Sequence, residues 1–198
     1  MRTPDLNWLK DSRVFQVNRL QAYSDHIYTI GKDKQPSSFS LNGTWKFNAS
    51  KNYDSTFKFF YNTEFNDSNW DDIQVPGHIQ LQGFGNPHYT DVTYPWDGKD
   101  YVKPGQVDMD RNKVFQYRKS FDLPKDFIND RLILSFEGVE SNIYVWLNGK
   151  FIGYSEDSFT PSRFDITKYV QATDNILCVR IFEKCSGTWL EDQDMWRF

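Results

Sequence analysis

An Asn-Gly dipeptide between two apolar runs is the feature that most constrains the fold of this chain. Asn148 and Gly149 separate residues 143–147 from residues 150–154, and Asn-Gly in such a place is the strongest short-range signal of a β-hairpin. Further short apolar runs occur at turn-marked intervals, without long amphipathic helices between them: they span residues 115–123, 132–136, 164–166 and 176–182. This spacing predicts an all-β antiparallel sandwich of the jelly-roll, galactose-binding-like kind.

The first of these runs alternates between apolar and polar residues. Phe115, Tyr117 and Phe121 fall on one parity, and Gln116 and Arg118 fall on the other. Such alternation is typical of a strand that is buried on one face only. We therefore expect the polar side chains of this strand to face water.

The rest of the chain is less regular. Residues 76–112 are dense in Pro and Gly, which predicts a long irregular loop, and loops of this length in a compact domain usually carry function. Residues 1–38 are weakly patterned and end in a polar stretch. We therefore expect an extended N-terminal arm and loop over residues 1–38, followed by a jelly-roll domain over residues 39–198.

Composition narrows the possible functions. With 7 Trp, 11 Tyr and 17 Phe, the chain is 18% aromatic, which excludes disorder and suits either a β-rich core or a flat carbohydrate-binding surface. The 23 basic and 27 acidic residues leave a net charge of -4. That balance gives no polyanion-binding signature, so we expect no nucleic-acid partner.

Neither a membrane nor an oxidising compartment is indicated. No apolar run approaches the ~18 residues of a membrane-spanning helix. Cys178 and Cys185 are the only cysteines, which is no disulfide framework and no thiolate metal site. The sequence therefore predicts a cytoplasmic protein without membrane contact.

The densest group of carboxylates lies near the C-terminus. Glu191, Asp192 and Asp194 stand between Trp189 and Trp196. Such acids can ligate a hard cation or accept hydrogen bonds from sugar hydroxyls, and a solvated acidic turn is the alternative. The flanking rings favour a sugar site, because a pyranose has apolar faces as well as hydroxyl groups.

Two further stretches stand out. In residues 89–96, aromatic residues flank Asp91; sugar binding and a loop that plugs the core with its rings are both open interpretations. In residues 153–162 we expect a structural role, with Ser and Asp side chains satisfying the backbone of a tight connection.

Six stretches, taken in order, resemble the N-terminal region of the large β-galactosidases of glycoside hydrolase family two, particularly those of lactic acid bacteria and their relatives. They are residues 40–45, 75–78, 89–96, 145–149, 153–158 and 190–196. The last, Leu-Glu-Asp-Gln-Asp-Met-Trp, is the most specific. The resemblance implies a sugar-binding jelly roll that precedes an immunoglobulin-like domain and a catalytic TIM-barrel domain.

The resemblance also implies what the parent enzyme does. It would hydrolyse terminal β-galactosides such as lactose with retention, through two glutamates on the barrel that have no match in this chain. We therefore expect no catalytic residue here and no activity from this chain alone. The aromatic residues within 194–198 also favour a piece of a longer protein. A stand-alone carbohydrate-binding module and a purely structural jelly-roll buttress are the alternatives.

Two family binding positions map onto this sequence. Asp194 matches an aspartate that contacts the galactose hydroxyls and helps to ligate a sodium ion, together with residues outside this chain. Asp91 matches a sugar-contacting position that is asparagine in the best-known relatives, so an acceptor-only group replaces one that can also donate. The magnesium ligands of the family belong to later domains, which places magnesium in the parent enzyme only.

The leading arm is the last point of resemblance. Residues 18–20 and 24–26 are similar to the arm that contributes to subunit contacts in the family, although Tyr23 stands where we would expect histidine. The resemblance therefore implies an oligomeric parent enzyme.

Overall fold

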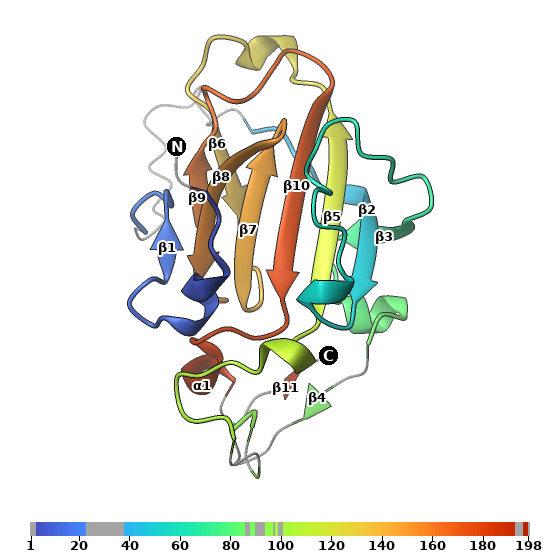
Figure 1. The fold of residues 1–198 in the computed structure, drawn as a ribbon. Helices are drawn as coiled ribbons and strands as arrows, with labels where there is room; N and C mark the ends of the chain where they lie inside the picture. Colours follow the sequence, from blue (N-terminus) through green and yellow to red (C-terminus); the bar gives the residue numbers. More distant parts are fainter. Residues whose placement is uncertain are drawn as a thin grey trace.

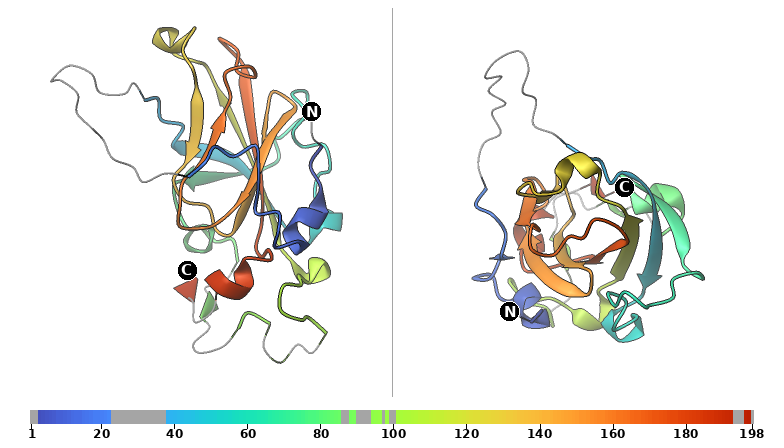
Figure 2. Two further views of the ribbon diagram at one scale, coloured as in Figure 1. Left: turned by 90° about the vertical axis from the view of Figure 1, so that its left-hand side faces the viewer. Right: turned by 90° about the horizontal axis from the view of Figure 1, so that it is seen from above.

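The computed structural model describes residues 3–22, 38–85, 88–89, 94–96, 98, 101–192 and 196–197, with the backbone alone at 88–89 and 196–197. These residues form antiparallel β-sheets joined by loops and very short helices. The predicted all-β antiparallel sandwich is thereby confirmed. Seen from above, the strands curl around a central core (Figure 2).

One seven-stranded sheet forms the body of the molecule (Figure 1). Its strand order is β1 (Gln16–Val17), β8 (Lys150–Glu156), β7 (Asn142–Leu147), β10 (Asn175–Phe182), β5 (Val114–Phe121), β2 (Gly43–Ser50) and β3 (Asp71–Val75). Two small sheets pair β6 (Ile133–Phe136) with β9 (Ser162–Asp165) and β4 (His88–Tyr89) with β11 (Trp196–Arg197). The helices are η1 (Leu6–Lys10), η2 (Tyr53–Ser55), η3 (Ile79–Gln82), η4 (Met109–Arg111), η5 (Lys125–Phe127) and α1 (Thr188–Glu191).

The predicted hairpin joins β7 to β8. Asn148 and Gly149 have φ angles of 51° and 75°, as the two central residues of a type I′ turn require. The Asn148 side chain also accepts from the Ile176 N–H at 2.8 Å and donates to the Tyr169 carbonyl at 2.9 Å. The turn is thereby fixed to the neighbouring part of the fold, and the hairpin prediction is confirmed.

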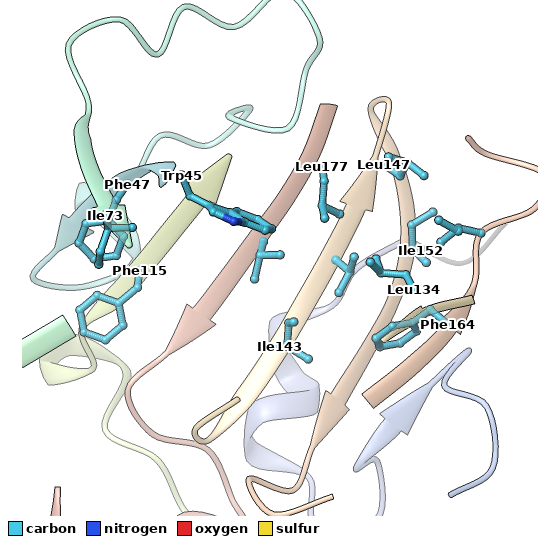
Figure 3. Close-up of a cluster of buried hydrophobic side chains, with 13 residues drawn as sticks. Trp45, Phe47, Ile73, Phe115, Leu134, Ile143, Leu147, Ile152, Phe164 and Leu177 are labelled. Carbon is cyan, nitrogen blue, oxygen red and sulfur yellow. The ribbon is translucent and has the colours of Figure 1, made fainter. Parts of the chain in front are cut away.

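An apolar core covers one face of the large sheet, which we call the inner face (Figure 3). Alternate residues of β7 and β10, such as Val145 and Leu177, point into this core. Leu134 of β6 and Phe164 of β9 close it from the other side. The small β6–β9 sheet therefore supplies the second layer of the sandwich.

The opposite, outer face of the large sheet is buried as well. Its core is rich in aromatic rings and includes Tyr144 and Trp146 of β7. Leu9 of η1 and the Phe60 and Trp70 side chains cover these rings, so residues 3–22 and the connection between β2 and β3 lie over this face (Figure 1). Within the described residues this cover consists of short helices and loops, and Val17 of β1 adds to the core from the edge of the large sheet.

The expectation that the polar side chains of β5 face water is confirmed for Ser120, which is exposed, and is wrong for Gln116 and Arg118. Gln116 is 0% and Arg118 is 4% exposed, because the connection between β2 and β3 lies over them. The Gln116 amide accepts from the Phe57 N–H at 3.1 Å and donates to the Phe57 carbonyl at 2.8 Å. The opposite parity, with Phe115 and Tyr117, faces the inner core as predicted.

The described part of the predicted N-terminal arm packs on the sheet. β1 pairs with β8, Asn18 donates to the Ile152 carbonyl at 2.9 Å, and the Leu20 N–H donates to the Arg163 carbonyl at 2.8 Å. Residues 23–37, which include much of the predicted arm and loop, lie outside the described residues.

The two cysteines are buried free thiols. Burial raises the pKa of each to about 12, which makes both thiols unreactive at neutral pH. Among the helices that the structure describes, none is long and apolar enough to cross a membrane.

Candidate functional site

The two predicted site residues, Asp91 and Asp194, lie outside the described residues, but the chain on either side of each is placed. β4 pairs antiparallel with β11, with Tyr89 opposite Trp196. β4 and β11 therefore meet beside α1, at one end of the large sheet (Figure 1). The two segments that the sequence singled out for sugar binding are neighbours in the fold.

Aromatic side chains also join these segments. The Trp189 ring packs at 5.9 Å from the Tyr94 ring and at 5.2 Å from the Trp96 ring. Its indole N–H donates to the Gln106 carbonyl at 2.8 Å. The rings lie against one another, so they fix the 94–96 segment to α1. Tyr94 remains 40% exposed, which leaves part of its ring accessible to a ligand.

The acidic residues near the C-terminus, Glu191 and Asp192, lie in different environments. Asp192 lies 3.5 Å from the Lys184 ammonium, and the two side chains are 3% and 14% exposed. Glu191 accepts two hydrogen bonds from Ser158. The solvated acidic turn is therefore wrong for Asp192, and both acids have structural partners. Asp194 is the member of the group that stays a predicted ligand-binding residue.

Burial sets the ionisation of Glu191. It raises the pKa of the carboxyl, the hydrogen bonds from Ser158 lower it, and the nearby charges of Asp157 and Asp192 raise it again. The net effect is a pKa above the usual range. The hydrogen bonds from Ser158 therefore favour the ionised carboxylate against the effect of burial.

Glu156, at the end of β8, ties this strand to the turn before α1. Its carboxylate accepts from the Tyr154 hydroxyl and, at 3.2 Å, from the Ser186 hydroxyl. Burial raises its pKa despite these hydrogen bonds and others from Cys185 and Gly187. The turn that precedes α1 is therefore held from the outer face of the large sheet. Sequence patterning gave no sign of this contact.

The loop after β8 has the structural role that its sequence predicted. Asp157, at a φ of 90°, accepts from the Phe159 N–H at 3.0 Å and the Thr160 N–H at 3.2 Å. Burial alone would raise the pKa of Asp157, but these bonds and the Arg19 charge lower it overall. Sequence reasoning missed the part of Arg19, which it placed in a subunit-contacting arm.

The described residues alone do not form a metal-binding site. Within the ranges that the structure describes, no group of three or more His, Cys, Asp or Glu side chains could hold a metal ion. The predicted sodium ligand, Asp194, is outside those ranges, so the sodium site stays a prediction.

A family model, described as the sugar-binding domain of the glycosyl hydrolases of family 2, matches residues 39–198. The chain belongs to this family. It is 50% identical over 200 residues to a β-galactosidase of Halalkalibacterium halodurans and 46% identical over 210 residues to a β-galactosidase large subunit of Leuconostoc lactis. Each match covers 98% of this chain, which spans 20% of the first relative and 34% of the second. The family resemblance predicted from the sequence is thereby confirmed.

Solved structures share the fold. A β-glucuronidase of Bacteroides uniformis superposes with a TM-score of 0.52, over 73% of this chain and 14% of that protein. Sequence identity is 23%, so this likeness concerns the fold alone.

Proposed function

We propose that this chain is the sugar-binding domain of a retaining β-galactosidase that hydrolyses terminal β-galactosides such as lactose. The pairing of β4 with β11 carries the proposal, because Tyr89 and Trp196, one residue from each of the two segments, stand opposite each other. Two relatives named β-galactosidase, 50% and 46% identical, support it. The two catalytic carboxyl groups that a retaining glycosidase needs would belong to a further domain, so this chain alone would be inactive.

In this proposal Asp194 and Asp91 contact the substrate. Asp194 accepts hydrogen bonds from galactose hydroxyls and gives one oxygen ligand to a sodium ion, which residues outside this chain complete. Carboxylate oxygen is the ligand type that hard cations prefer, so the residue type fits both tasks. Asp91 accepts from a second sugar hydroxyl. The enzyme would act in the cytoplasm as an oligomer, with magnesium bound only by its later domains.

A chimeric enzyme tests the proposal. The 200 aligned residues of the Halalkalibacterium halodurans β-galactosidase are replaced by this whole chain, and lactose hydrolysis is measured. We expect the chimera to be active, and Asp194→Asn to lower kcat/KM by at least about tenfold, as the loss of a metal-site contact does. Asp91→Asn should retain activity, because the amide oxygen still accepts a hydrogen bond, whereas Asp91→Ala should lower it.

The isolated chain distinguishes the alternatives. Its amide NMR spectrum is recorded with lactose, in sodium and then in potassium buffer. Sodium-sensitive shifts at Asp91 and Asp194 would mean that the domain carries a preformed half of the site, and no shifts would mean a site completed by another domain. Lactose binding without any effect of Asp194→Asn in the chimera would favour a stand-alone module instead. Turnover by the isolated chain would contradict the proposal.

A further inference from the structure

The tripeptide Leu-Asn-Gly occurs twice in this chain, at residues 41–43 and at residues 147–149. Asn-Gly is the dipeptide most prone to spontaneous deamidation, because glycine has no side chain to hinder attack by its own nitrogen on the preceding asparagine. The rate depends chiefly on the residue that follows the asparagine, so the two copies have the same intrinsic reactivity. A difference between them in the folded chain must therefore come from the fold.

The reaction needs no partner other than water. The glycine nitrogen loses its proton to solvent base and attacks Cγ of the asparagine, so that a C–N bond forms and the amide nitrogen leaves as ammonia. Water then opens the succinimide ring at either of its carbonyls, which gives aspartate or isoaspartate. The asparagine side chain must therefore be able to turn toward the next backbone nitrogen.

Three hydrogen bonds hold the Asn148 side chain. Its oxygen accepts from the Ile176 N–H at 2.8 Å, and its amide nitrogen donates to the Tyr169 carbonyl and to Asn175 Oδ1, both at 2.9 Å. All three partners lie outside the β7–β8 hairpin, in β10 and in the segment before it. The amide cannot turn toward the Gly149 nitrogen until these bonds break.

The side chain of Asn42 lacks comparable support. Asn42 is exposed, and its backbone N–H donates to the Ser40 hydroxyl at 3.2 Å. Within the described ranges, its side chain forms no hydrogen bond. The space beside Gly43 is open as well, since no described atom beyond the adjacent residues lies within 4 Å of the position that a Cβ would take. The Asn42 amide is therefore free to turn, and a succinimide ring has room to form.

The Gly43 nitrogen also stands at the end of a strand pair. Gly43 is the first residue of β2 and lies opposite Val75, the last residue of β3. β3 is an edge strand of the large sheet (Figure 1), and the end of an edge pair opens locally at low cost in free energy.

We propose that Asn42 is a deamidation site of the native chain, and that the fold protects Asn148 from the same reaction. The product at residue 42 carries an added negative charge. Where it is isoaspartate, it also adds one carbon to the backbone directly before β2.

Both sites lie in one molecule, so a single incubation compares them. The folded whole chain is aged at mildly alkaline pH, and peptide mapping by mass spectrometry follows the conversion of amide to acid at each site. We expect Asn42 to react at least about tenfold faster than Asn148, a factor that corresponds to about 1.4 kcal/mol, because the three hydrogen bonds of Asn148 must break first. Methylation by an isoaspartyl methyltransferase distinguishes isoaspartate from aspartate among the products.

The same chain in urea provides the matched control. Once the chain is unfolded, the two Leu-Asn-Gly copies should react at the same rate. A second control is Asn42→Gln, because glutamine cyclises far more slowly than asparagine. This variant should lose the fast conversion in the folded state and keep Asn148 as slow as in the wild type.

Equal rates at the two sites of the folded chain, or a faster reaction at Asn148, would overturn the proposal. A fast conversion that persists in Asn42→Gln would overturn it too, because another residue would then be the site. The ratio of the two rates in urea completes the test. If that ratio is the same as in the folded chain, local sequence rather than the fold sets the difference, and the inferred protection of Asn148 is wrong.

Discussion

The two faces of the large sheet are both buried, but by different means. Along β10, Leu177 and Val179 point to the inner face, and Cys178 and Arg180 point to the outer face. The buried cluster on the inner face consists of apolar residues, and the β6–β9 sheet closes it. The outer face carries aromatic rings together with buried Arg and Gln side chains. Residues 3–22 and the connection between β2 and β3 cover it.

The difference follows from how the backbone hydrogen bonds of each covering segment are satisfied. A covering strand satisfies much of its backbone by pairing, as β6 does with β9. An irregular segment brings unpaired carbonyls into the interior, and each needs a donor. Arg118 supplies donors to the carbonyls of Phe60, Asn62 and Phe65. A loop can therefore cover the outer face because buried polar side chains of the sheet donate hydrogen bonds to its carbonyls.

The largest effect we expect comes from Arg118→Met. Arg118 also pairs with Asp67 at 2.7 Å, so the substitution would leave loop carbonyls and a carboxylate without their donor. Asp67 is 30% exposed, so its loss of a partner is partly offset by water, but the buried loop carbonyls are not; together we expect a cost of about 3 kcal/mol, at the low end for a buried pair. Urea unfolding of the whole chain measures the loss. A cost below about 1 kcal/mol would mean that the loop carbonyls find water instead, and the argument for the outer face would fail.

Leu177→Ala tests the inner face. Leu177 is fully buried, and removal of a core leucine costs about 3 kcal/mol, within the range of 2–5 kcal/mol, depending on how far the cavity collapses. The same urea titration gives the value. Unlike Arg118→Met, this variant should leave the hydrogen-exchange protection that residues 57–67 owe to local opening at its wild-type level, because Leu177 belongs to the core on the opposite face. Lost protection there would show that the two faces are not independent.

The same contrast explains which parts of the fold the sequence predicts. The inner face is visible in the alternation of β5, because its apolar residues need only be matched by other apolar residues. Arg118 and Gln116 follow the same alternation but indicate the wrong exposure, since nothing in the pattern of β5 reveals that a distant loop covers them. The residue pattern of a strand predicts the strand itself, but it does not predict which distant segment of the chain covers it.

The site shows the same division. The aromatic and acidic composition of residues 89–96 and 189–196 marked them as candidates, and Tyr89 and Trp196 stand opposite each other in the β4–β11 pair. The contacts that support them come from elsewhere in the chain: Ser158 on the loop after β8 and Arg19 near β1. A short hydrogen-bonding side chain in a loop has no periodic signature, so these partners were not predictable.

Arg180→Met sharpens the comparison within the outer face. The Arg180 guanidinium lies 5.0–5.3 Å from the centres of the Tyr53, Phe60 and Trp146 rings and donates one hydrogen bond, of 3.4 Å, to the Lys58 carbonyl. Burial lowers its pKa. Methionine loses a cation–π contact of about 2 kcal/mol and the long hydrogen bond to Lys58, but it removes the cost of burying a charge and still packs on the rings.

We therefore expect Arg180→Met to change the free energy of unfolding by no more than about 1 kcal/mol, because these opposing effects largely cancel. Urea unfolding beside Arg118→Met is the measurement. A loss as large as that of Arg118→Met would mean that the charge at Arg180, like that at Arg118, is required by the covering loop.

The smallest effect concerns Glu156, at the edge of the outer face. Its pKa is raised in the folded chain, chiefly by burial, above the usual value of 4.5. Just above pH 4.5 the folded chain therefore holds a proton that the unfolded chain has lost, so the Glu156 contribution to stability falls as the pH rises through this window. Glu156→Gln does not titrate and lacks this dependence. Unfolding free energies measured for both proteins from pH 4.5 to 7 should show the wild type losing stability relative to Glu156→Gln. A difference that stays constant, or moves the other way, would mean that the hydrogen bonds from Tyr154 and Ser186 fully offset the burial of the charge.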